Sequence, residues 1–111
     1  MESFELITLF RSFLYELDPP QGFISIGVNK ASEWFRTLNN KQQVEIFEYV
    51  STKFQIKGDT IEKEILIMFL QILGGDKSVK LLESIIEDGV EVHSVYLIQN
   101  SKNAIKKILS R

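Results

Sequence analysis

Residues Thr60 to Leu73 read TIEKEILIMFLQIL, the most continuously apolar stretch of the chain. Apolar side chains recur there at three- and four-residue steps, as on a helix, and others occupy the remaining sides. Asp59 precedes the stretch and can cap a helix, and Gly74 and Gly75 follow it and can end one. We therefore predict a buried central helix over Thr60–Leu73, with Phe69 in the core.

The central helix needs cover from other parts of the chain. Helical spacing predicts a first helix over Ser3–Leu17, a short one over Asn29–Leu38 and a long one over Lys41–Gln55. Asp76–Asp88 has the same periodicity. We expect the central helix to pack between Lys41–Gln55 and Asp76–Asp88.

Two other segments carry patterns that also occur in strands. Alternate residues of Phe23–Val28 are apolar, but a short strand without a clear partner is not stable, so we predict an extended crossing loop. Val90–Arg111 is predicted to hold two shorter helices, the second of which starts at Asn100 or Ser101. A small strand pair between Phe23–Val28 and Val90–Val92 is the α+β alternative.

The predicted fold is all-α, with five to six antiparallel helices in one domain over residues 1–111. The chain has no cysteine, which excludes disulfides and thiolate metal sites. Its start lacks a basic region, and Glu2 and Glu5 interrupt the apolar residues, so it is not a secretory signal. The apolar run of the central helix is too short to span a membrane. We predict a cytoplasmic protein that does not bind membranes.

Two helical segments share a sequence pattern. Val44–Val50 and Val79–Ile85 both fit V-[EK]-[IL]-[FL]-E-x-[VI], at a separation within the range of about 20–50 residues that marks repeats. Ser78–Ile98, with Asp88 and then Val92-His93 at its turn, resembles a helical hairpin of the HEAT-repeat family. The resemblance implies a short HEAT-like α-solenoid, and a compact irregular bundle is the alternative.

The sequence offers no set of residues for catalysis. His93 is the only histidine, so a general base or a transition-metal site would lack its usual partners, and we expect a half-exposed structural residue. The phosphate-binding glycine motifs are absent, and the acidic pairs do not form a Glu-x-x-His site. We therefore predict no catalytic, cofactor-binding or metal-binding residue, and no enzyme activity.

The charge of the chain also limits its partners. Thirteen basic and fifteen acidic side chains give a net charge of −2, which argues against non-specific nucleic-acid binding. Lys102–Arg111 is basic, but cations are favourable at the end of a helix without any ligand. A nucleic-acid-binding regulator that uses this tail is the third functional hypothesis.

Binding to another protein is the first hypothesis. In outline the chain resembles small all-α bacterial immunity proteins, which are short, mildly acidic helical domains without a catalytic or cofactor motif. The resemblance implies that the chain binds and neutralises a cognate toxin, with acidic side chains facing a basic nuclease. The predicted partner-binding residues are Glu83, Glu87, Asp88 and Glu91.

The second hypothesis is a helical adaptor or a homo-oligomeric scaffold. Ten of the twelve aromatic residues (Phe, Trp and Tyr) precede residue 55, and some of them could anchor a partner. The candidates for such exposed anchors are Tyr15, Phe23, Trp34 and Tyr49.

Overall fold

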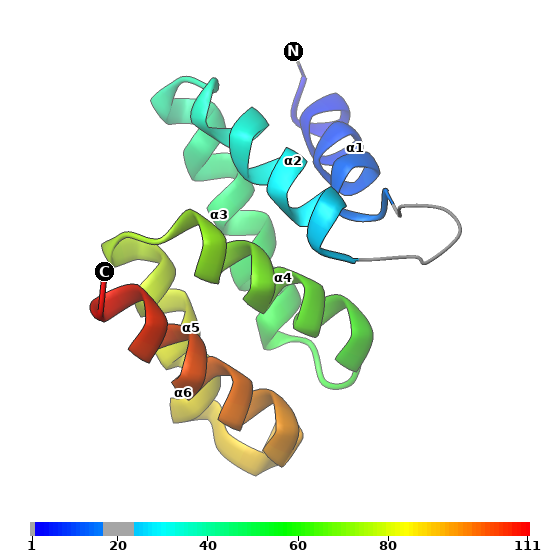
Figure 1. The fold of residues 1–111 in the computed structure, drawn as a ribbon. Helices are drawn as coiled ribbons and strands as arrows, with labels where there is room; N and C mark the ends of the chain where they lie inside the picture. The colour runs from blue at the N-terminus through cyan, green and yellow to red at the C-terminus, as the bar shows by residue number, and fades with distance from the viewer. Residues whose placement is uncertain (1, 17–23) are drawn as a thin grey trace.

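The computed structural model describes residues 2–16 and 24–111. These ranges hold six α-helices, one short 3-10 helix and no strand, which confirms the all-α prediction (Figure 1). No helix in the described ranges is long and apolar enough to cross a membrane. The elements are α1 (Ser3–Leu14), α2 (Ile24–Arg36), α3 (Asn40–Gln55), α4 (Thr60–Leu73), α5 (Asp76–Asp88), η1 (Gly89–Glu91) and α6 (Val95–Leu109).

The helices form two layers. Helices α1, α3 and α5 pack side by side in one layer, and α2, α4 and α6 pack side by side in the other. Figure 1 looks onto the layer of α2, α4 and α6, with α3 and α5 behind it. Helices within a layer run in the same direction: the side chain of Tyr96 bonds that of Glu64 near the starts of α6 and α4, and Arg111 reaches the carbonyl of Gln71 near their ends. Successive helices therefore alternate between the layers.

Helix α4 has the predicted bounds and lies at the centre of the core. Ile65, Leu66 and Leu70 are buried, and the ring of Phe69 lies 4.9 Å from that of Phe10 on α1. The predicted neighbours of α4 are incomplete. It does contact α3 and α5, but its largest interfaces are with α2 and α6, because alternation places those helices beside it in the same layer.

The two ends of α4 differ from each other in how well they were predicted. Gly74 has a φ of 72°, a conformation that glycine adopts without strain, as expected for the end of the helix. Asp59 does not cap the start with its side chain. It adopts a left-handed conformation, with φ of 50°, and its backbone carbonyl accepts a hydrogen bond of 3.0 Å from the Lys63 amide.

Helix α2 begins earlier than predicted. Ile24–Val28 belong to the helix, so the prediction of an extended loop is wrong for these residues, and Phe23 lies outside the described residues. Val28 is buried in register with Ala31 and Phe35, which extends the helical period backwards. Gly27 allows this packing, because a Cβ there would lie 2.8 Å from the carbonyl oxygen of Leu14 at the end of α1.

The C-terminal part contains one long helix instead of two short ones. Ser94 caps α6 by accepting a hydrogen bond of 3.2 Å from the Leu97 amide. Asn100 and Ser101 lie inside α6, and the buried Ser101 hydroxyl donates to the Leu97 carbonyl at 2.9 Å, so it needs no helix break. Val90–Val92 form no strand, since η1 covers Gly89–Glu91.

The remaining boundaries agree with the predictions for α3 and α5, whereas α1 and α2 end earlier than predicted. Helix α3 begins at Asn40, one residue early, behind a capping box formed by Asn39 and Gln42. Helix α5 has the predicted bounds. Helix α1 ends at Leu14, so the predicted end at Leu17 is wrong: Tyr15 and Glu16 already lie outside the helix. Helix α2 ends at Arg36, two residues before the predicted end at Leu38.

Candidate binding surfaces

The four acidic residues predicted to bind a partner are all exposed. Glu83, Glu87 and Asp88 lie in the second half of α5, and Glu91 ends η1. Glu83 and Glu87 are four residues apart and therefore lie on one side of the helix. We call these four residues the acidic face.

Most of the acidic face has no cation to neutralise it. In the part of the chain that the structure describes, Glu83, Glu87 and Glu91 form no salt bridge. Asp88 is the exception, because its Oδ2 lies 3.5 Å from the Nε2 atom of His93. The acidic face thus carries negative charge that the fold itself does not use.

Exposed apolar side chains occur in the segment that follows α5. Val90 in η1 and Val95 at the start of α6 are each 71% exposed, and Tyr96 is 56% exposed. The Tyr96 hydroxyl donates a hydrogen bond of 2.9 Å to Glu64 on α4, which holds its ring at the surface. Apolar anchors beside charged residues are the usual composition of a protein-binding surface.

His93 is buried, so the expectation of a half-exposed residue is wrong. Its Nδ1 atom lies 3.2 Å from the ammonium of Lys63, which α4 holds in a fully buried position. Its Nε2 atom has no hydrogen-bond partner of suitable geometry among the described residues. The pair joins α4 to the turn between η1 and α6.

Burial controls the protonation of both members of this pair. Burial lowers the pKa of Lys63 below its ordinary value, although the carboxylates of Asp59 and Asp88 oppose the change. Burial and then the charge of Lys63 lower the pKa of His93, and Asp88 again acts in the opposite direction. A neutral His93 can accept a hydrogen bond from the Lys63 ammonium at its Nδ1 atom, and the pair then avoids two positive charges side by side.

A second polar cluster joins α1, α3 and α4. Glu62 accepts hydrogen bonds from Arg11 at 2.6 Å and from Tyr49 at 2.7 Å, and Lys53 lies 3.6 Å away. Burial, together with the hydrogen bond to Glu62, raises the pKa of Tyr49 to about 12. Burial alone would raise the pKa of Glu62, but the Tyr49 hydrogen bond and the two cations outweigh it and lower that pKa. This cluster explains Tyr49 as a bridge between helices.

The other aromatic residues proposed as anchors have different positions. Trp34 is half-buried against the rings of Phe10 and Phe13, so it belongs to the margin of the core. Tyr15 is partly exposed beside Arg11, and Phe23 lies outside the described residues. Phe4, which was not among the predicted anchors, is 81% exposed on α1. Its spacing from Ile7 and Phe10 fits the apolar stripe of α1, so spacing alone does not distinguish it from its buried neighbours.

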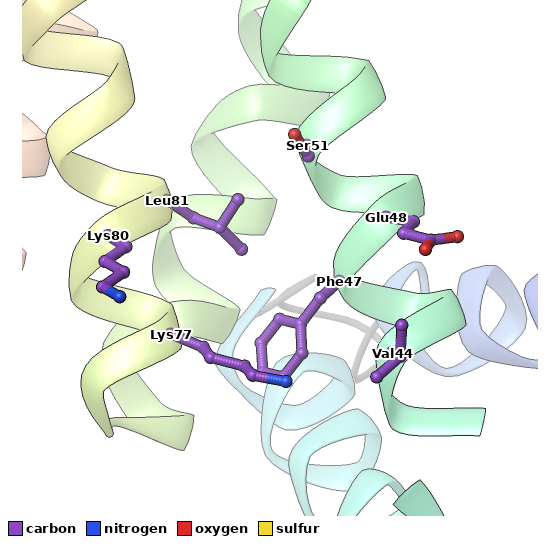
Figure 2. A pocket seen from close by; sticks show the side chains of 7 residues that line it. All are labelled: Val44, Phe47, Glu48, Ser51, Lys77, Lys80 and Leu81. Atoms are coloured by element: carbon purple, nitrogen blue, oxygen red, sulfur yellow. The ribbon is translucent and has the colours of Figure 1, made fainter. Parts of the chain in front are cut away.

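A groove of about 290 Å³ runs between α3 and α5. Val44 and Phe47 of α3 and Leu81 of α5 form its apolar floor (Figure 2). Figure 2 shows the Phe47 ring and the Leu81 side chain pointing into the space between the two helices. The rim carries Ser51 and Glu48 on the α3 side and Lys77 and Lys80 on the α5 side.

Within the described ranges, no three histidine, aspartate or glutamate residues lie close enough together to hold a metal ion. No protein-family model, curated protein or solved structure matches the chain. The resemblances to HEAT repeats and to immunity proteins therefore remain predictions, and the case for function depends on the two surfaces above.

Proposed function

We propose that this chain is a small protein-binding domain and that it acts as an immunity protein, which binds and neutralises a cognate bacterial toxin. The observation that carries the proposal is the acidic face, whose four carboxylates are exposed, together with the exposed side chains of Val90, Val95 and Tyr96 in the segment that follows α5. The partner that this surface fits is a protein with a basic site, such as a nuclease that binds phosphate groups.

The two parts of the surface have separate roles in the proposed complex. Unpaired carboxylates attract a basic partner over several ångströms and so increase the association rate, and they select against acidic partners. Val90, Val95 and Tyr96 supply the apolar area whose burial slows dissociation. The buried pair of Lys63 and His93 keeps the turn in place before the partner arrives, which limits the ordering cost of binding.

Growth protection tests this proposal. The product of each gene next to the one for this chain is expressed in a bacterial host, and a product that stops growth is co-expressed with the wild-type chain. We expect one such product, and we expect the chain to restore growth. The triple variant Glu83→Lys, Glu87→Lys and Glu91→Lys should lose protection while remaining folded by circular dichroism.

A matched variant controls for the change in total charge. The variant Glu2→Lys, Glu5→Lys and Glu33→Lys changes the net charge by the same amount. All three positions are exposed: Glu2 precedes α1, Glu5 lies on α1 and Glu33 lies on α2. This control should protect like the wild type. The proposal is wrong if no neighbouring product is toxic, or if both triple variants protect equally well.

A further inference from the structure

We propose that the groove between α3 and α5 binds an amphipathic helix of a partner protein, with acidic residues on the side of the helix that faces α5. None of the residues that line the groove belongs to the acidic face, so this inference does not depend on the proposed immunity function. It identifies a second surface and the chemistry of the segment that fits it.

The groove has the length and shape of a helix-binding site. Val44, Phe47, Glu48 and Ser51 recur at steps of three and four along α3, so they form a line of two helical turns, roughly 10 Å long. Lys77, Lys80 and Leu81 form a second, shorter line of about one helical turn on α5. Two lines of side chains on neighbouring parallel helices leave the type of furrow into which the ridge of a third helix packs.

The apolar floor is open to solvent. Val44 is 39% exposed, and Phe47 and Leu81 are only partly buried. The groove is lined by residues of α3 and α5 alone, because α2, α4 and α6 form the other layer of the fold. A partner that covered the groove would therefore bury apolar area that the described part of the chain leaves in water.

The backbone of the groove favours a helix over an extended peptide. The groove walls are α-helices, whose backbone groups already bond each other along the helix. An extended peptide would need new partners for its own amides and carbonyls, and the groove offers only Ser51, Glu48 and two lysines. A helix arrives with its backbone groups already bonded, so it needs only apolar contacts and matched charges.

The charges at the rim define the two flanks of the partner. Lys77 and Lys80 on α5 form no salt bridge within the described residues, and neither does Glu48 on α3. The Lys77 ammonium lies over the Phe47 ring, 5.6 Å from its centre. The fitting helix has an apolar stripe, glutamate or aspartate on the flank next to α5, and lysine or arginine on the flank next to Glu48.

Two synthetic peptides test this inference. Each is about 16 residues long, enough to form a helix on binding, with leucines in one helical stripe. The mixed peptide has glutamates on one flank and lysines on the other, and the basic peptide has lysines on both. Titration of the isotope-labelled chain, followed by NMR, should show that the mixed peptide shifts the amides of Val44, Phe47 and Leu81 and binds at least tenfold more tightly than the basic peptide.

Charge reversal on α5 should reverse this preference. In the variant Lys77→Glu and Lys80→Glu, the basic peptide should bind more tightly than the mixed one, since both flanks then face carboxylates. The matched control is Lys102→Glu and Lys106→Glu on α6, which makes the same change in net charge at exposed positions away from the groove. The control should keep the wild-type preference.

Three results would overturn the inference. The first is no shift of the groove amides by either peptide at about 1 mM, a concentration that detects even weak complexes. The second is an equal change of preference in the α5 variant and in the α6 control. The third is self-association measured by sedimentation, reversed by Phe4→Ala, which would show that a second copy of the chain occupies the groove through its exposed α1 residue.

Discussion

The ammonium of Lys63 lies 3.2 Å from the Nδ1 atom of His93, and both side chains are buried. Only one of the two can be charged without repulsion, and the lowered pKa of His93 indicates that the histidine is the neutral member. This contact links α4 to the turn before α6, so we expect its protonation to affect the stability of the domain.

We expect the free energy of unfolding to fall as the solution is made acidic. The pKa of folded His93 lies below its ordinary value of 6.5, so the unfolded chain takes up the proton first. The contribution of His93 to the free energy of unfolding is then fully present above pH 6.5. It is lost as the pH falls towards the folded pKa, with a slope of up to about 1.4 kcal/mol per pH unit. Urea unfolding between pH 8 and about pH 5 measures the slope. His93→Gln, which cannot titrate, should flatten it, and an unchanged slope in that variant would assign the effect to other groups.

The pKa of His93 itself should respond in opposite directions to two substitutions. Lys63→Met removes a neighbouring positive charge, so the pKa should rise. Asp88→Asn removes the carboxylate that raises it, so the pKa should fall. His93 is the only histidine, so its ring proton can be followed directly in an NMR titration. Shifts in the same direction would show that the two charges do not act as the structure indicates.

Phe69→Ala should destabilise the domain by about 3–5 kcal/mol, because it opens a cavity where α1, α2 and α4 meet. The Phe69 ring lies 4.9 Å from that of Phe10 and 5.9 Å from that of Phe35. Phe69→Asp should prevent folding, since it places an unpaired charge in the core. Phe4→Ala is the control: Phe4 is 81% exposed, so its loss should change the free energy of urea unfolding by less than about 0.5 kcal/mol.

A spectrophotometric titration should find one tyrosine with a pKa of about 12, which we assign to Tyr49. Glu62→Gln removes the carboxylate that accepts the Tyr49 hydrogen bond, so this pKa should move down towards its ordinary value of 10.0. Tyr49→Phe identifies the transition by removing it. If the transition near 12 survives in Tyr49→Phe, it belongs to another tyrosine.

The sequence predicted the elements whose signals are local. Helix α4 was found with its bounds because a long apolar run ends at Gly74-Gly75, and α5 because its periodicity is clear. The start of α2 was missed because Ile24, Ile26 and Val28 alternate over a stretch too short to distinguish a strand from a helix. The break expected at Ser101 was wrong because a serine can bond the preceding turn and remain inside a helix.

The candidate surfaces were predicted only where the sequence of a single helix determines exposure, and features that depend on distant contacts could not be predicted. The exposure of Glu83 and Glu87 follows from the polar side of α5, and the structure agrees. Lysine is among the residues least often buried, so nothing near Lys63 indicates that it lies inside against His93. Val44 has the spacing of a buried residue of α3, yet it is 39% exposed, because no element in the described ranges covers the groove between α3 and α5.

The position of α4 between α2 and α6, with α3 and α5 across the layer, also determines which backbone amides are best protected from solvent exchange. To expose the amides of α4, the chain must break contacts with α2, α3, α5 and α6, whereas α1 packs mainly on α2 and α3 at one end of the two layers. Hydrogen–deuterium exchange should therefore be slowest in the middle of α4, at a rate set by global unfolding, and faster in α1, which can detach while the rest stays folded.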